Sequence, residues 1–256
     1  PGDLALRLGL MGVPRNCDKM GRHDEILKGL QAWAGQFYGA DATVERLVRL
    51  SGGASQETWS LDIERPGRVE ELILRRVPGG VSVARNSEAI GLGTEAKLLS
   101  CADGTVPAPK VIQVFEPGSD IGEAFLMNRI PGQTIARKIL RDDDYRIARE
   151  KLTHQCGAAL AAIHAIPTAE LPDLPTSGGL DQLEKYETIY RAFNLPRPVF
   201  ELAIAWLKSN VPSAVPPVLV HGDFRLGNLI VDSDGLAAVL DSPISAIRGK
   251  ISPGSA

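Results

Sequence analysis

The spacing of apolar residues changes at Pro131-Gly132, and this change divides the chain into two differently built parts. Before it, short runs such as "ETWSLDI" alternate apolar and polar residues and end at glycine or proline. Such runs predict β-strands, because successive side chains point to opposite faces of a strand. After it, apolar residues follow one helical face from Tyr145 to Ile163. The sequence therefore predicts an α+β chain with a β-rich part followed by a helical part.

Four segments are predicted from this pattern. The first residues carry glycine, proline and charge without clear periodicity, and the last are rich in proline, glycine and serine, which is typical of a loop. One helix is expected inside the β-rich part over residues 86–102, with Asn86 or Ser87 as its cap. The predicted segments are 1–23, a loose leader; 24–130, a first lobe; 131–241, a second lobe; and 242–256, a tail.

Composition excludes several classes of protein. With 44% hydrophobic and 23% charged residues, the chain resembles an average globular protein. Its net charge of -3 provides no basic surface for nucleic acid or an anionic membrane. Cys17, Cys101 and Cys156 form no CxxC pair, so they indicate neither a zinc site nor a disulfide framework. We expect a cytoplasmic protein without a nucleic-acid or membrane partner, and we infer no obligatory protein partner.

Polar residues interrupt the aliphatic stretch "LVHGDFRLGNLIVDSDGLAAVLDS". Asp232 to Gly235 predict a hairpin turn between two short strands. Such a hairpin would bring Asp241, at the end of its second strand, back beside Asn228 at the start of its first. Asp223 precedes both in a loop that the flanking strands hold. The pattern predicts that two carboxylates and one carboxamide converge.

These residue types suit phosphoryl transfer. Mg²⁺ prefers oxygen ligands and keeps substrate phosphate and water in its shell, so it needs few protein ligands. The reaction also asks for a carboxylate that orients the attacking hydroxyl and for a cation near the phosphoryl group. The expected roles are hydroxyl-orienting base for Asp223, metal ligand for Asn228 and Asp241, and charge-offsetting cation for Arg225. We expect Mg²⁺ and ATP as cofactors, with GTP left open.

The motif "HGDFRLGN" followed by "VLD" resembles those of the aminoglycoside phosphotransferase and choline kinase-like enzymes, which are relatives of protein kinases. Together with "LSGGASQETW", this motif is most similar in sequence to the kinase-like domain found alone in bacteria and fused to certain acyl-CoA dehydrogenases. The resemblance implies a bilobal protein-kinase-like fold, with Asp223 as catalytic base and Asn228 and Asp241 as magnesium ligands. It spans roughly residues 40–241.

The resemblance also implies a nucleotide-binding set, in which an arginine stands where lysine is familiar. By themselves these residues have ordinary alternatives: the glycine stretch could be a hairpin turn, and Arg75 and Arg76 could be alternating strand positions. His221 is expected to brace its loop. The implied residues are Ser51, Gly52, Gly53, Ala54 and Ser55 in a loop covering the nucleotide; Arg75 and Glu95 as a phosphate-binding pair; and Met127, Asn128 and Arg129 beside adenine.

The residues after Asp241 depart from the family pattern. The family continues with an aromatic and an acidic residue, a Gly-Asp-Pro and further helices, whereas "SPISAIRGKISPGSA" follows here. We therefore expect a truncated second lobe that lacks its last helices. One hypothesis is an ATP- and Mg²⁺-dependent phosphotransferase acting on a hydroxyl of an aminoglycoside, amino alcohol, sugar or hydroxyacyl thioester. The alternative is an inactive fragment that binds nucleotide or a partner without turnover. Metal-assisted hydrolysis is less favoured, because too few ligands gather for a dedicated metal.

Overall fold

The structure is a computed structural model. It describes residues 16–50, 56–80, 90–211, 216–240 and 247–248. Two compact units make up the chain: Pro1–Val81 with Phe115–Ala124, and Ser82–Val114 with Phe125–Ala256. These units follow packing and do not coincide with the expected lobes, so the lobe boundary at residue 130 stays a prediction. Among the described helices, none has the length and apolar character needed to cross a membrane.

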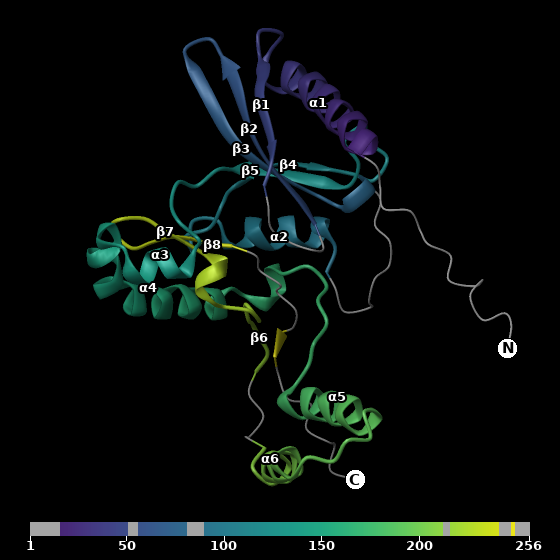
Figure 1. Ribbon diagram of the computed structural model, residues 1–256, viewed down its shortest axis with the longest axis vertical. Coiled ribbons are helices and arrows are strands. Elements are labelled where there is room, and N and C mark those ends of the chain that lie inside the picture. Colours follow the sequence, from purple (N-terminus) through teal and green to yellow (C-terminus); the bar gives the residue numbers. More distant parts are fainter. Residues whose placement is uncertain (1–15, 51–55, 81–89, 212–215, 241–246, 249–256) are drawn as a thin grey trace, which may run out of the picture. The chain divides into compact units, whose positions relative to one another are not determined.

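Unit 1 contains three consecutive antiparallel strands and one helix (Figure 1). On strand β2, Trp59, Leu61 and Ile63 are buried, as the alternating pattern predicts. Residues 51–55, which connect β1 to β2 in the chain, lie outside the described part. The elements are α1 (Asn16–Tyr38), β1 (Thr43–Arg49), β2 (Glu57–Arg65) and β3 (Arg68–Arg76).

Helix α1 packs along β1 and closes one face of this unit (Figure 1). Ile26, Leu30 and Ala34 recur every four residues and are buried, which places them on one helical face. The helix begins at Asn16, inside the expected leader 1–23. The expectation was wrong there because the first turns lack an apolar stripe, and backbone hydrogen bonds along a helix need none.

A buried ion pair joins β2 to β3. Glu57 lies opposite Arg76 in the strand register, and Arg76 Nη1 is 3.0 Å from Glu57 Oε2. Arg76 Nε also donates to the carbonyl of Ile121 at 2.6 Å. Half-exposed Arg22 and Arg49 reach the other carboxylate oxygen at 3.3 and 3.8 Å. Of the two neighbouring arginines of β3, Arg76 is therefore the buried, structural one.

Unit 2 is mainly helical, with short strand pairs. Strands β4 and β5 are neighbours, β6 pairs with β9, and β7 pairs with β8. The helices are α2 (Leu92–Ala102), α3 (Ala136–Arg141), α4 (Arg146–Ala165), α5 (Gly179–Ala192) and α6 (Pro198–Ser209). The strands are β4 (Val111–Phe115), β5 (Ala124–Asn128), β6 (Val218–Leu219), β7 (Leu229–Val231), β8 (Leu236–Val239) and β9 (Ile247–Arg248).

Two boundaries in unit 2 differ from the expectation. Helix α2 begins at Leu92, because Gly91 takes an extended conformation and serves as its N-cap. The expected caps, Asn86 and Ser87, lie outside the described residues. Strand β9 falls inside the expected loop-like tail and pairs antiparallel with β6. Two residues are too few to show any periodicity, so this strand could not be predicted from the sequence.

The core of unit 2 supports the polar loop after β6. Apolar side chains from α2, α4 and strands β6, β7 and β8 form one buried cluster, which includes Leu98, Leu152, Leu219 and Val239. The β7–β8 hairpin is fixed to α4, where Gln155 Oε1 accepts from the amide of Leu236 at 2.9 Å. The loop is thus held between elements that share one core.

Candidate functional site

The loop that follows β6 is braced by His221, which is almost fully buried. Its Nε2 lies 3.0 Å from the carbonyl of Leu240. Its Nδ1 lies 3.3 Å from the backbone N–H of Asp223. Because a carbonyl only accepts, Nε2 carries the hydrogen of the first contact and Nδ1 accepts in the second. His221 therefore links the two ends of the candidate site, as its expected bracing role requires.

Gly222 turns the chain so that Asp223 projects from the loop. Its φ of 78° lies in the left-handed region, where a side chain is strained. Asp223 Oδ2 accepts from Arg225 Nε at 3.0 Å and from Asn228 Nδ2 at 2.9 Å. Nδ2 of Asn228 also donates to the backbone carbonyl of Asp223 at 2.9 Å. The structure thus brings together three of the four residues expected at the catalytic centre.

The electrostatics of this cluster favour an ionised Asp223. The hydrogen bond from Arg225 is the main cause that lowers the pKa of the Asp223 carboxyl below its ordinary value, and the one from Asn228 adds to it. About half of the Asp223 side chain is exposed, so a hydroxyl from solution can reach it. A carboxylate with a low pKa accepts a hydrogen bond well but is a weak proton acceptor. Such a carboxylate is better suited to orient a hydroxyl than to remove its proton.

The predicted hairpin after Asn228 is confirmed. Strands β7 and β8 pair antiparallel with Leu229 opposite Val239. In the turn, Asp232 Oδ1 accepts from the amides of Asp234 and Gly235 at 2.8 and 2.9 Å. The amide of Leu240 then donates to the carbonyl of Asn228 at 2.8 Å. Asp241 is the next residue, but it lies outside the described part, so its approach to Asn228 stays a prediction.

The donor set fits a metal that takes few protein ligands. Asn228 is buried, and its Nδ2 is used on Asp223. Its carboxamide oxygen Oδ1 is therefore the atom that a cation could take. Within the described residues, no cluster of three or more His, Cys, Asp or Glu side chains could hold an ion. A single carboxamide oxygen is compatible with Mg²⁺, which takes one or two protein oxygens and completes its shell with water and phosphate.

The expected nucleotide-covering loop, Ser51 to Ser55, lies outside the described residues. At its edge, Arg75 donates from Nε to Gln56 Oε1 at 2.9 Å. Sequence reasoning did not single out Gln56, since a glutamine after a glycine turn carries no motif. Gln56, the first described residue after that stretch, thus holds the Arg75 side chain through its carboxamide. A phosphate contact by Arg75 stays a prediction.

The remaining expected nucleotide residues belong to unit 2. Glu95 is buried in the first turn of α2, and its pairing with Arg75 stays a prediction. Met127 and Asn128 end β5, and Arg129 follows them. The N–H of Asn128 donates to the carbonyl of Lys110 at 3.1 Å, and its side-chain oxygen accepts from the amide of Lys110 at 2.5 Å. The N–H of Asn128 is therefore already hydrogen-bonded within unit 2. Of the backbone groups of Asn128, the carbonyl is the one that could contact a nucleotide base.

The fold is that of solved antibiotic phosphotransferases. The GDP complex of wild-type aminoglycoside 2'-phosphotransferase-IIIa superposes with a TM-score of 0.64 at 16% identity, covering 84% of this chain and 72% of that chain. Macrolide 2'-phosphotransferase MphH from Brachybacterium faecium gives a TM-score of 0.56 at 15% identity, with coverages of 84% and 72%. At these identities the likeness concerns the fold alone, and it confirms the expected kinase-like α+β architecture.

Sequence comparison adds a relative and a family. Acyl-CoA dehydrogenase family member 10 of Mus musculus is 28% identical over 210 residues, which cover 78% of this chain and 19% of that protein. The chain thus spans about a fifth of the length of this relative. Residues 46–241 match the family described as "Phosphotransferase enzyme family", and this range includes every residue of the candidate site. Because that match extends over most of the sequence, the chain belongs to the phosphotransferase enzyme family.

Proposed function

We propose that this chain is an ATP- and Mg²⁺-dependent phosphotransferase that moves the γ-phosphate to a hydroxyl of a small molecule. The observation that carries the proposal is the Asp223 carboxylate, which Arg225 and Asn228 hold at 3.0 and 2.9 Å in a loop braced by buried His221. Membership of the phosphotransferase enzyme family supports it. The cytoplasmic location and the absence of a nucleic-acid partner stay predictions.

In this proposal Asp223 accepts a hydrogen bond from the acceptor hydroxyl and aims its oxygen at the γ-phosphorus. A new oxygen–phosphorus bond forms as the bond from the γ-phosphorus to the bridging oxygen breaks, and ADP leaves. The hydroxyl proton passes to Asp223 late or goes to solvent, because the transition state is loose and the carboxylate is a weak base. Orientation is then the main contribution of Asp223.

Three further residues would complete the reaction centre. Asn228 Oδ1 and Asp241 would hold Mg²⁺, which when bound neutralises charge on the phosphate oxygens. Arg225 contacts Asp223 through Nε, so its two Nη groups could meet negative charge that develops on the transferred group. Arg225 would thus fix the position of Asp223 and also contribute charge.

The acceptor is proposed only as a hydroxyl-bearing small molecule. Support for this class comes from the fold neighbours, which include a macrolide phosphotransferase and a phosphotransferase in a ternary complex with streptomycin and ATP. Both describe other proteins. Amino alcohols, sugars and hydroxyacyl thioesters remain acceptor classes to assay beside aminoglycosides.

The test is acceptor-dependent release of ADP or GDP from the Mg²⁺ nucleotide, with the phosphorylated product identified by mass spectrometry. We expect Asp223→Asn to lower kcat at least about 100-fold while nucleotide affinity is kept. The matched control is Asp234→Asn, which removes an exposed carboxylate from the turn of the same hairpin and should keep activity. Nucleotide binding without turnover of any acceptor would support the inactive-fragment alternative and refute the proposal.

A further inference from the structure

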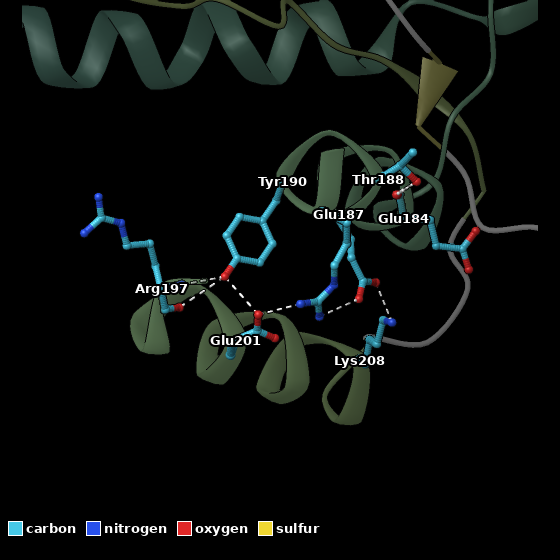
Figure 2. Close-up of polar contacts among 8 residues, drawn as sticks. Glu184, Glu187, Thr188, Tyr190, Arg197, Glu201 and Lys208 are labelled. Atoms are coloured by element: carbon cyan, nitrogen blue, oxygen red, sulfur yellow. Dashed lines mark hydrogen bonds and ion pairs between the residues drawn. The ribbon is translucent and has the colours of Figure 1, made fainter. Parts of the chain in front are cut away.

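Charged and polar side chains outside the candidate site join α5 to α6. Figure 2 shows Tyr190 of α5 directed toward Glu201 of α6, where its hydroxyl donates to Oε1 at 2.9 Å. Lys208 of α6 pairs with Glu187 of α5. Lys208 is about half exposed, and exposed ion pairs contribute little because solvent screens them. This network fastens two neighbouring helices to each other.

A second network, in unit 1, is buried and joins more elements. Its centre is Glu57, the first residue of β2, whose side chain is 1% exposed. Arg76 of β3 contacts Oε2 at 3.0 Å, while Arg22 of α1 and Arg49 of β1 approach Oε1 at 3.3 and 3.8 Å. A buried carboxylate needs partners that compensate its charge. Glu57 therefore attaches α1, β1 and β3 to the beginning of β2.

Arg49 lies where the chain leaves β1, and Glu57 lies where it enters β2. The stretch between them includes residues 51–55, which are expected to cover the nucleotide and lie outside the described part. Backbone pairing continues beyond Arg49, because the amide of Leu50 donates to the carbonyl of Thr58 at 2.8 Å. Ordering a segment on a ligand costs less free energy when the ends of the segment are already fixed. The contact between Arg49 and Glu57 fixes both ends of this stretch.

The same corner of the sheet holds Arg75, the residue expected to contact phosphate. Gln56 comes directly before Glu57, and its Oε1 accepts from Arg75 Nε at 2.9 Å. Arg75 in turn comes directly before Arg76 on β3. Two consecutive residues thus hold two consecutive arginines. A shift of Glu57 would therefore displace Gln56 and, with it, the Arg75 side chain.

Helix α1 reaches this corner through Arg22 and His23. His23 Nε2 lies 3.3 Å from the carbonyl of Leu47, and because a carbonyl only accepts, Nε2 is the donor. The His23 ring also contacts Trp59, with ring centroids 5.9 Å apart. Helix α1 precedes residues 46–241, the range that matches the family, and none of the expected site residues lies on it.

We propose that Arg22 and Glu57 are positioning residues for the nucleotide. Through them, α1 holds both ends of the stretch between β1 and β2 and, through Gln56, the guanidinium of Arg75. Neither residue needs to contact the nucleotide, because Glu57 is buried and Arg22 acts through it. The inference rests on nucleotide binding in the proposed function, but it does not require transfer of the phosphate.

Equilibrium binding of Mg²⁺-ATP and Mg²⁺-GTP to the full chain measures this role. Arg22→Met removes the cation of α1 but leaves Glu57 with Arg49 and Arg76, so the chain should stay folded, which circular dichroism checks. We expect the Kd of the nucleotide that binds more tightly to rise about 2- to 30-fold. Arg22→Lys restores the charge and should recover most of the lost affinity.

The matched control is Arg65→Met, the same substitution at the other end of β2. Arg65 also joins α1 to the sheet, because its Cζ lies 4.7 Å from the ring centroid of Tyr38, and it pairs with Glu70 at 3.2 Å. It lies roughly 26 Å along the strand from Glu57, at about 3.3 Å per residue. Arg65→Met should leave the nucleotide Kd unaltered even where it lowers stability, so it separates positioning from general loosening of the unit.

Arg75→Met supplies a measurement that a purely structural role of Arg22 would not change. If Arg22 acts through Arg75, the loss of affinity caused by Arg22→Met should be smaller in the Arg75→Met background, whereas the losses at independent sites add. Fully additive losses would overturn the inference. So would an Arg22→Met chain that binds like the wild type, an Arg22→Lys chain that recovers nothing, or an Arg65→Met control that weakens binding equally.

Failure of the proposed function would look different. A wild-type chain that binds nucleotide without transferring phosphate would refute the proposed function alone, because the positioning role is measured by binding. A wild-type chain that binds neither nucleotide would overturn both.

Discussion

The buried ion pair between Glu57 and Arg76 offers a quantitative test of what holds unit 1 together. Glu57→Gln removes the carboxylate and, within the part of the chain that the structure describes, leaves Arg76 with the carbonyl of Ile121. Arg76→Met removes the guanidinium but leaves Glu57 with Arg22 and Arg49 at 3.3 and 3.8 Å. The two substitutions break the same contact but leave different charges behind, so the structure predicts unequal effects.

The magnitudes follow from those remaining charges. Breaking a buried pair by removing one partner costs about 3–5 kcal/mol when the other charge is left uncompensated. Glu57→Gln should reach that range, because the guanidinium of Arg76 stays buried and Arg22 and Arg49 remain nearby as like charges. Arg76→Met should cost about 2–3 kcal/mol, because two half-exposed arginines still compensate the carboxylate. The double variant should lose less than the sum of the two, since neither charge is orphaned.

Urea is uncharged and does not screen ion pairs. Urea unfolding therefore measures these differences in the free energy of unfolding. In a Trp206→Phe background the remaining tryptophans, Trp33 and Trp59, both belong to unit 1, so their fluorescence reports on that unit alone. The control is Glu70→Gln, because Glu70 also contacts two arginines, at 3.2 and 2.9 Å, but in more exposed positions. It should cost at most about 1 kcal/mol. A larger loss for Arg76→Met than for Glu57→Gln would refute the reasoning from residual charge.

Three further changes test the candidate site and its support. Arg225→Gln removes the main cause of the lowered pKa of Asp223, so the carboxylate should protonate earlier as pH falls. The acidic limb of the kcat/KM profile should then move to higher pH. A limb that does not move contradicts the proposed role of Asp223. Gly222→Ala should cost about 1–2 kcal/mol in thermal melting, because its φ of 78° is left-handed, whereas Gly93→Ala in α2 should be neutral or slightly stabilising. Gln155→Ala leaves a hairpin amide unpaired and should cost about 1–3 kcal/mol, with faster hydrogen exchange of that amide as the specific sign.

The candidate catalytic loop could be predicted from the sequence because its contacts are local. Asp223, Arg225 and Asn228 lie within six consecutive residues, and the hairpin that follows them carries a turn that its residues specify. Strand alternation in unit 1 and the helices α4, α5 and α6 were likewise recoverable, since each repeats a period over many residues. The proposed function rests on the same short stretch.

The contacts that sequence reasoning missed join residues far apart in the chain. Gln155 reaches the β7–β8 hairpin across 81 positions, and Arg76 reaches Ile121 across 45. Neither side chain belongs to a motif, and glutamine or arginine at such positions is usually solvated. The short elements α3 and β9 were not predicted for another reason. They have six and two residues, which are too few to show a periodic pattern.

The position of His221 connects the local motif to the rest of the fold. Its ring contacts the backbone of Asp223 on one side and of Leu240 on the other, and Leu240 itself pairs with Asn228. A shift of the β7–β8 hairpin would therefore displace the carboxylate proposed to orient the hydroxyl and the proposed metal ligand together. In the proposed reaction a low-pKa Asp223 contributes by orientation more than by basicity, so small displacements should reduce the rate steeply. The buried ring of His221 would then affect the reaction rate by holding these groups in position, without itself contacting the substrate.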